Sequence, residues 1–270
     1  MKKFFDKYLK LFLLSTHNFL INFFTRIFLP QKIYASKDYY FKKMDEVRSS
    51  SMKDNFDNNV EYNIPNDFIF DLAFKTVVVH KRSNITLNHG KLLYSELKKY
   101  IKNNNNNFIN IIETGTARGY SAICMAKALN DCNQDGKIYS FDILPHRKKI
   151  FWNTVDDLEG KKTREEILVP WKNLIDKYII FINSFAHLAM RAINFNRINF
   201  AFLDGSHYGH DIKYEFSHVA KFQLKSDITI FDDFNEKKYK DVHAEVIKLI
   251  KKYNYKSSSV DINNSGRKIL

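Results

Sequence analysis

Residues 111–121 read IIETGTARGYS, an apolar run that ends in a carboxylate and continues into a loop with two glycines. Residues with helical spacing follow, from Ser121 to Leu129. This order of features predicts a buried strand, a tight turn and a helix N-terminus. Such a unit is the usual nucleotide-binding corner of an open α/β sheet.

The loop lacks the glycine pattern of a dinucleotide site. That pattern is G-x-G-x-x-G, and counting from Gly115 this chain has Ala117 and Tyr120 in place of the second and third glycines. The pattern here is E-x-G-x-x-x-G. The carboxylate of Glu113 repels a pyrophosphate, but it suits a cationic amino-acid head group.

This stretch resembles the first motif of the class I S-adenosylmethionine-dependent methyltransferases. The resemblance implies that Glu113 reaches the methionine amino group, directly or through water. It also implies that Gly115 lets the backbone approach the cofactor and that Gly119 allows close packing at the helix start. Thr116 and Ser121 complete the part of the cofactor site expected in this loop.

A second acid follows the next strand. Residues 138–142 read IYSFD, so this strand ends in Asp142. In an open α/β sheet an acid at this place can accept both ribose hydroxyls, and the resemblance assigns Asp142 to the ribose of S-adenosylmethionine. Asn183 and Ser184, after the third strand, are expected to contact the adenine.

Strand and helix patterns alternate along the chain. Strands are predicted at 108–113, 137–141, 178–182, 198–203 and 227–231, and helices at 85–102, 119–130, 163–177, 184–193, 209–223 and 237–252. Residues 256–260 and 268–270 read as a closing hairpin. This order predicts an α/β fold with a doubly wound, mainly parallel sheet of about seven strands, Rossmann-like as in the class I methyltransferases.

Two further apolar strands end in acids. Residues 200–207 read FAFLDGSH and residues 228–234 read ITIFDDF. Neighbouring parallel strands would bring Asp204, Asp232 and Asp233 together, and three carboxylates in one place favour a divalent cation such as Mg²⁺. Otherwise these acids simply turn the chain or cap a helix.

Both stretches resemble a subgroup of metal-dependent small-molecule and sugar O-methyltransferases, with D-G-x-H after the fourth strand and an acidic pair after the fifth. The resemblance implies that Asp204, Asp232 and Asp233 are metal ligands and that His207 is the general base, with Asp204 beside it in catalysis. In that family a tyrosine often stands two places after the histidine, where this chain has Gly209. A transition-metal site at His207, His210 and Asp211 is the less favoured alternative.

Composition adds little about partners. The formal net charge is +13, but the basic residues are scattered and asparagine, isoleucine and phenylalanine are also abundant, so we attribute the charge to compositional bias. The two cysteines, Cys124 and Cys132, have no metal-site or disulfide spacing. The lack of a disulfide pattern fits a cytoplasmic protein in a reducing compartment.

The N-terminus stands apart from the rest. Residues 1–30 alternate lysines with phenylalanine and leucine runs but are too interrupted for a spanning helix. They predict either an interfacial helix that contacts a membrane peripherally or a helix that packs on the domain or on a second subunit of a homo-oligomer. We place an apolar helix and an irregular cap or linker in residues 1–66, and the methyltransferase domain in residues 67–270.

The function expected from these features is S-adenosylmethionine-dependent O-methylation of a small-molecule or glycan hydroxyl, assisted by a divalent cation. Two alternatives remain. One is methylation of nucleic acid, which the Asp204-Gly205-Ser206-His207 loop disfavours because it lacks the Asp-Pro-Pro-Tyr type of sequence. The other is a membrane-associated, non-catalytic binding protein with the same fold.

Overall fold

The computed structural model describes residues 29–33, 35–80, 85–205, 208–262 and 268–269. The predicted helix over residues 1–30 lies almost wholly outside these described residues, and so does the predicted base His207. Both therefore stay predictions from the sequence.

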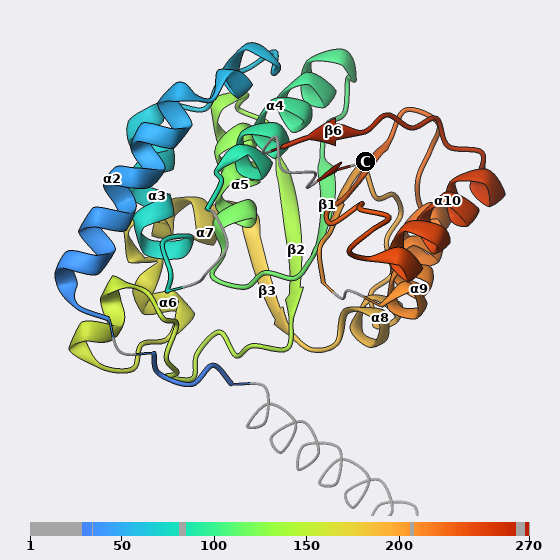
Figure 1. Ribbon diagram of the computed structural model, residues 1–270. Helices are drawn as coiled ribbons and strands as arrows, with labels where there is room; N and C mark the ends of the chain where they lie inside the picture. Colours follow the sequence, from blue (N-terminus) through green and yellow to red (C-terminus); the bar gives the residue numbers. More distant parts are fainter. Residues whose placement is uncertain (1–28, 34, 81–84, 206–207, 263–267, 270) are drawn as a thin grey trace, which may run out of the picture.

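A five-stranded parallel sheet forms the centre of the molecule (Figure 1). Its strands, in the spatial order β3-β2-β1-β4-β5, are β1 (Ile109–Thr114), β2 (Gly136–Asp142), β3 (Ile179–Asn183), β4 (Phe200–Leu203) and β5 (Ile228–Phe231). In the register of the sheet, Thr114 lies opposite both Phe141 and Leu203. The residues that follow these strands therefore meet at one edge of the sheet, as the sequence predicted.

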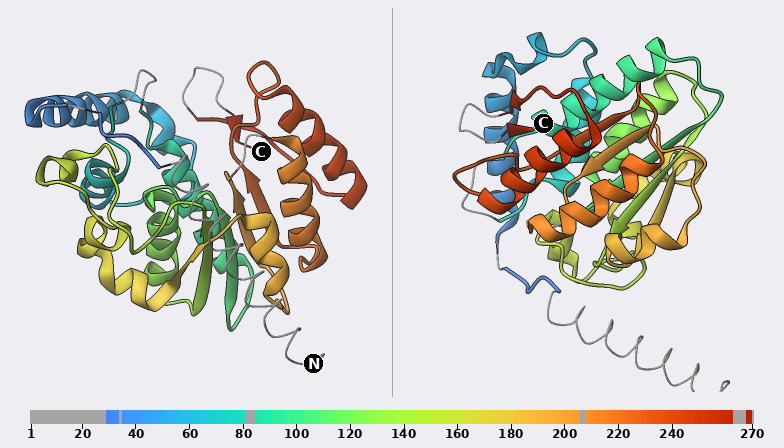
Figure 2. Two further views of the ribbon diagram at one scale, coloured as in Figure 1. Left: turned by 90° about the horizontal axis from the view of Figure 1, so that it is seen from below. Right: turned by 90° about the vertical axis from the view of Figure 1, so that its right-hand side faces the viewer.

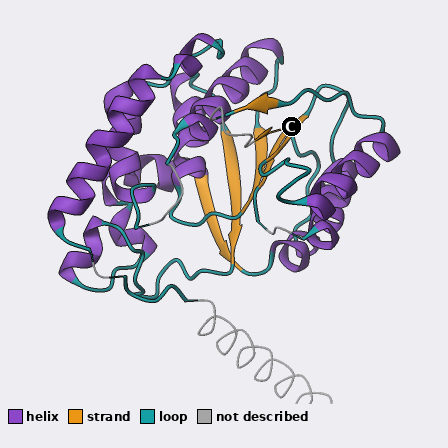
Figure 3. Cartoon of the chain, in the orientation of Figure 1, coloured by secondary structure: helices purple, strands orange, loops and turns teal. Residues whose placement is uncertain are grey.

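Helices cover both faces of this sheet (Figures 1, 2 and 3). One layer contains α2 (Lys37–Lys53), α3 (Asn66–Thr76), α4 (Asn88–Asn103), α5 (Tyr120–Asp131), α6 (Arg164–Ile167) and α7 (Lys172–Tyr178). The other contains α8 (Ala186–Ala189), α9 (Gly209–Lys221) and α10 (Lys240–Tyr253). This arrangement confirms the predicted doubly wound α/β fold.

The alternation of side chains along the strands divides the core between these layers. Ile109 and Ile111 of β1 are buried in the hydrophobic cluster beneath α4 and α5. Ile112, also of β1, lies on the opposite face of the sheet, where it is buried with residues of α9 and α10. A strand covered on both faces reads as a continuous apolar run, which is why its sequence predicted a buried parallel strand.

Two predicted segments differ from the structure. Residues 31–66 were expected to be irregular, but α2 occupies much of this segment and buries Tyr40, Met44 and Val47 at helical spacing. The helix predicted over 163–177 is divided into α6, a short 3₁₀ helix and α7, and Pro170 lies at the division. Proline lacks the N–H group that a continuous α-helix requires.

The C-terminal hairpin forms, but it does not join the central sheet. β6 (Val260–Asp261) and β7 (Lys268–Ile269) pair antiparallel in a sheet of their own. The Asn88 side chain donates a hydrogen bond of 2.7 Å to the carbonyl of Ile262, which holds the hairpin at the start of α4. Among the described residues the central sheet therefore has five strands, and the prediction of about seven is corrected.

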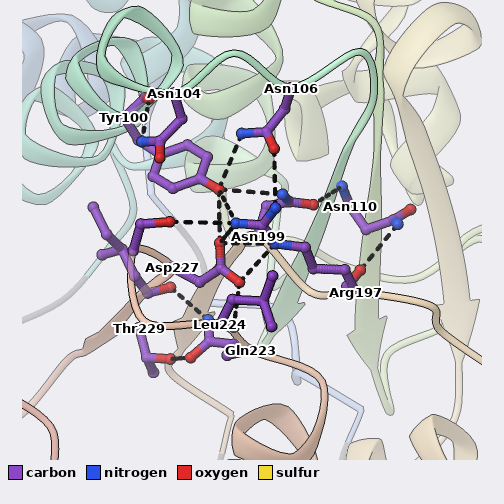
Figure 4. Close-up of polar contacts among 12 residues, drawn as sticks. Tyr100, Asn104, Asn106, Asn110, Arg197, Asn199, Gln223, Leu224, Asp227 and Thr229 are labelled. Carbon is purple, nitrogen blue, oxygen red and sulfur yellow. Dashed lines mark hydrogen bonds and ion pairs between the residues drawn. The ribbon is translucent and has the colours of Figure 1, made fainter.

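A buried polar network joins the elements at the opposite edge of the sheet (Figure 4). The Asp227 side chain is fully buried and accepts hydrogen bonds from Arg197 Nη2 at 2.6 Å and from the Tyr100 hydroxyl at 2.7 Å. Asn106 accepts a further bond from Arg197 at 3.1 Å. One asparagine of the run at 103–107 thus belongs to a structural network.

Replacing Arg197 by alanine should strongly destabilise the fold. The buried Asp227 carboxylate would lose its cationic partner, and breaking a buried ion pair in this way costs about 3 kcal/mol. Urea denaturation measures the free energy of unfolding. Lys172→Ala is the matched control, because the Lys172–Asp176 pair is exposed and its loss should leave the free energy of unfolding almost unchanged. Equal losses in the two variants would contradict the structural role of the network.

Within the part of the chain that the structure describes, none of the helices has the length and apolar character needed to cross a bilayer.

Candidate cofactor and acceptor site

The loop between β1 and α5 owes its path to its glycines. Gly115 and Gly119 have φ angles of +86° and +93°, in the left-handed region that glycine adopts without strain. A Cβ atom on Gly115 would lie 2.1 Å from the carbonyl oxygen of Asp204. A Cβ atom on Gly119 would lie 2.8 Å from a methyl group of Leu168. The loop is therefore pressed against the end of β4 on one side and against the α6 region on the other.

Glu113 is fully buried beneath this loop. One carboxylate oxygen accepts a hydrogen bond from the Ser121 hydroxyl in the first turn of α5, and the other accepts one from Ser140 of β2. Ser140 also shares a hydrogen bond of 2.5 Å with the buried Thr116 hydroxyl. The structure thus joins Glu113, Thr116 and Ser121 as predicted for one site, but it directs Glu113 inward, towards hydroxyl groups of the protein.

Burial raises the pKa of Glu113 to about 7, although the hydrogen bonds from Ser121 and Ser140 oppose the shift. Because the pKa is raised in the folded state, this group contributes stability at pH values below its ordinary pKa. That contribution is lost as the pH rises towards 7 and above. The wild type should therefore lose stability relative to Glu113→Gln between pH 5 and pH 8, by about 3 kcal/mol at most.

Thermal unfolding of the wild type and Glu113→Gln at several pH values tests this expectation. Other groups that titrate in this range are common to the two proteins and cancel in the difference between their melting temperatures. A difference that stays constant from pH 5 to pH 8 would contradict the assigned pKa.

Asp142 closes the loop from the end of β2. Its carboxylate accepts hydrogen bonds from the backbone N–H groups of Ala117 at 2.5 Å and Leu144 at 2.7 Å. The buried guanidinium of Arg164 lies 3.4 Å away. Burial raises the pKa of Asp142, and the charge of Arg164 offsets only part of that effect. The acid predicted for a ribose therefore lies beside the glycine loop, at the edge where a nucleoside would bind.

Arg164 is a site residue that the motifs did not reveal. Its side chain donates to the carbonyl of Ala117 at 2.9 Å and to the carbonyl of Leu144 at 3.2 Å, so it joins the glycine loop to the segment after β2. Arg118 makes a similar link from the loop itself, since its Nε donates to the carbonyl of Trp152 at 2.6 Å. Only their tertiary partners distinguish these two arginines from the many basic residues of the chain.

The predicted adenine contacts lie at the end of β3. The Asn183 amide donates to the carbonyls of Asp142 and Ile143, and the Ser184 N–H donates to the carbonyl of Asp142 at 2.9 Å. A cavity of about 840 Å³ borders Asn183 and is lined in part by His146 and Phe181. The two rings are stacked with their centroids 4.3 Å apart. Burial lowers the pKa of His146 to about 4, so this imidazole is neutral at physiological pH.

The acids after β4 and β5 lie at the same edge. The N–H of Asp232 donates to the carbonyl of Leu203 at 3.2 Å, so the residues that end these two strands are neighbours. Asp232 is buried, and its carboxylate accepts the N–H of Asp233 at 2.8 Å. Asp233 has a left-handed φ angle of +53°, which marks a sharp turn at this point.

The arrangement of these acids shows whether they are placed to hold a metal ion. Among the described residues, which include Asp204, Asp232 and Asp233, no group of three or more histidine, cysteine, aspartate or glutamate side chains is placed to hold a metal ion. The strand ends converge as predicted, but their carboxylates do not form a ready set of three ligands. The predicted Mg²⁺ site is therefore not shown among the described side chains.

Comparison with known proteins bears on this architecture. Residues 112–234 match the family model described as "Methyltransferase domain". No curated protein sequence matches the chain significantly. The match spans the segment from β1 to just past β5, which carries both the glycine loop and the acids after β4 and β5.

Solved structures share the fold at low sequence identity. The O-methyltransferase NovP is 12% identical, with a TM-score of 0.55 over 87% of this chain and 98% of its own. PaMTH1 of Podospora anserina, solved with S-adenosylhomocysteine, is 11% identical, with a TM-score of 0.54 over 89% and 97%. The O-methyltransferase TomG of Streptomyces achromogenes, solved with S-adenosylmethionine, is 12% identical, with a TM-score of 0.52 over 84% and 96%.

Proposed function

We propose that this chain, whose residues 112–234 match the methyltransferase-domain family model, is a class I methyltransferase that transfers a methyl group from S-adenosylmethionine to a hydroxyl oxygen of a small molecule or sugar. The observation that carries the proposal is the pairing of the glycine loop with Asp142 across neighbouring strand ends. The neighbours NovP and TomG are both named as O-methyltransferases, and CalS11, a further neighbour at 12% identity and a TM-score of 0.51, as a TDP-rhamnose 3'-O-methyltransferase.

Each part of the site has a role in binding the methyl donor. Gly115 and Gly119 let the loop pack closely against the end of β4 and the α6 region, and the N-terminus of α5 favours the negative charge of the methionine carboxylate. Asp142 accepts the ribose hydroxyls in exchange for part of its present bonding to Ala117 and Leu144. Glu113 acts from beneath, by fixing Ser121 and Ser140.

The chemical step needs little from the protein beyond placement and a base. S-adenosylmethionine supplies an electrophilic methyl group bound to a positively charged sulfur. By the resemblance described above, His207 takes the proton of the acceptor hydroxyl as the oxygen bonds to the methyl carbon. The bond from carbon to sulfur breaks, and the products are a methyl ether, S-adenosylhomocysteine and a proton on the base. Alignment of the three reacting atoms supplies the remaining acceleration.

A transfer assay with methyl-tritiated S-adenosylmethionine tests the proposal. Three acceptor classes are offered separately: a sugar nucleotide such as TDP-rhamnose, a phenol such as catechol, and transfer RNA. We expect label on a hydroxyl of the sugar or the phenol and none on RNA. Label confined to RNA would contradict O-methylation of small molecules.

The divalent cation is a separate proposal with its own test. A bound Mg²⁺ would lower the pKa of an acceptor oxygen. The prediction rests on the acids that follow β4 and β5 and on the resemblance, since the described side chains do not show the site. Removal of metal with EDTA, followed by addition of Mg²⁺, should abolish and restore transfer. Full activity in EDTA would show that the reaction proceeds without the cation.

A further inference from the structure

A second buried acid lies under the carboxyl edge of the sheet and belongs to none of the motifs. Glu215 is on α9, between Ile212 and Val219 in the buried stripe of that helix, and it is 2% exposed. The Thr114 hydroxyl, at the end of β1, donates a hydrogen bond of 2.9 Å to its carboxylate. Glu215 therefore reaches from the helix layer to the strand that precedes the glycine loop.

The same carboxylate lies against the turn that follows β4. A Cβ atom on Gly205 would lie 3.4 Å from Oε1 of Glu215 and 3.0 Å from the Thr114 side chain. The N–H of Asp204 donates to the carbonyl of Thr114 at 3.1 Å. The carbonyl of Asp204 in turn blocks any side chain on Gly115. The Asp204–Gly205 turn thus lies between Glu215 on one side and the glycine loop on the other, in contact with both.

Packing alone does not account for an acid in this position. Burial raises the pKa of Glu215 to about 7, and the hydrogen bond from Thr114 only partly opposes that effect. Burying a carboxyl group costs stability that an apolar side chain of similar size would not cost. An apolar side chain could not accept the hydrogen bond that the Thr114 hydroxyl donates to Glu215. This hydrogen bond is therefore what the acid contributes at this position.

We propose that Glu215 is a positioning residue, which through Thr114 and Gly205 holds the Asp204–Gly205 turn against the glycine loop and so keeps the cofactor pocket in shape. This inference rests on the proposed function, because it assigns Glu215 to the S-adenosylmethionine site. Glu215 itself does not touch the reacting atoms.

Binding of S-adenosylhomocysteine to the full chain, measured by calorimetry, tests the role without knowledge of the acceptor. Glu215→Ala should weaken binding at least about tenfold, whereas Glu215→Gln, which still accepts the Thr114 hydrogen bond, should remain within about threefold of wild type. Thr114→Val should also weaken binding, and Thr114→Ser should not. The Thr114 pair keeps the test decisive if Glu215→Ala fails to fold.

Tyr100→Phe is the control for a general loss of stability. It removes a buried hydroxyl that donates to a carboxylate, as Thr114→Val does, but at the opposite edge of the sheet. It should lower the melting temperature and leave binding unchanged. Wild-type affinity in Glu215→Ala or Thr114→Val overturns the positioning role, as does an equal loss of affinity in Tyr100→Phe. A wild type that does not bind S-adenosylhomocysteine overturns the proposed function as well.

Discussion

Replacing Gly115 by alanine should weaken the binding of S-adenosylhomocysteine roughly 100-fold or more. The added Cβ atom would lie 2.1 Å from the backbone carbonyl oxygen of Asp204, and a backbone atom cannot be relieved by a change of rotamer. The φ angle of +86° adds strain for any L-residue. The loop and the end of β4 would have to separate, which deforms the pocket. Calorimetric titration with S-adenosylhomocysteine measures the loss.

Gly160→Ala is the matched control for this variant. Gly160 has a similar left-handed φ angle of +102°, but a Cβ atom there would meet nothing within 4 Å. This variant therefore carries the backbone strain without the collision, and its affinity should equal that of the wild type. Wild-type affinity in Gly115→Ala would show that the loop does not need its contact with Asp204.

Asp204→Asn and His207→Ala should each lower the rate of methyl transfer roughly 100-fold or more while S-adenosylhomocysteine still binds. Asparagine keeps the shape of the turn against Gly115 but removes the charge that the resemblance places beside the acceptor. His207 lies outside the described residues, and its role as base follows from the resemblance of the D-G-x-H motif. The transfer assay described above, with the acceptor class that accepts label, gives the rate.

His210→Ala serves as the control for the histidine variant. His210 is exposed, with 73% of its side chain accessible, and its contacts are with Asp211 and Tyr214. It should retain nearly the full rate. Turnover in His207→Ala equal to that of His210→Ala would remove the proposed base. Loss of cofactor binding in either Asp204→Asn or His207→Ala would instead place the residue in the cofactor pocket.

The sequence contained the information for the sheet and its acidic edge. Each central strand is covered by helices on both faces, so it appears as an apolar run, and a carboxylate that ends such a run lies by necessity at the carboxyl edge. Glu113 and Asp142 were found in this way. The direction of the Glu113 side chain could not be predicted in this way, because it depends on the hydroxyls of Ser121 and Ser140, which come from two other elements.

What the sequence did not reveal depends on distant partners. The structure buries Arg164 and Glu215, and only their partners in other elements, such as Asp142 for Arg164 and Thr114 for Glu215, explain the burial. Glu215 left one signal, which is an acid inside the apolar stripe of Ile212, Phe216 and Val219. The separate C-terminal hairpin was likewise unpredictable, since the hydrogen bond between Asn88 and Ile262 joins residues 174 positions apart.

The most direct test of the central claim is a calorimetric titration of the full wild-type chain with S-adenosylhomocysteine, beside one with NAD⁺. The claim is that Asp142 and the loop from Gly115 to Gly119 together form a pocket for the methyl donor and not for a dinucleotide. It predicts one molecule of S-adenosylhomocysteine bound per chain and no binding of NAD⁺. Binding of NAD⁺, or no binding of S-adenosylhomocysteine, would contradict it.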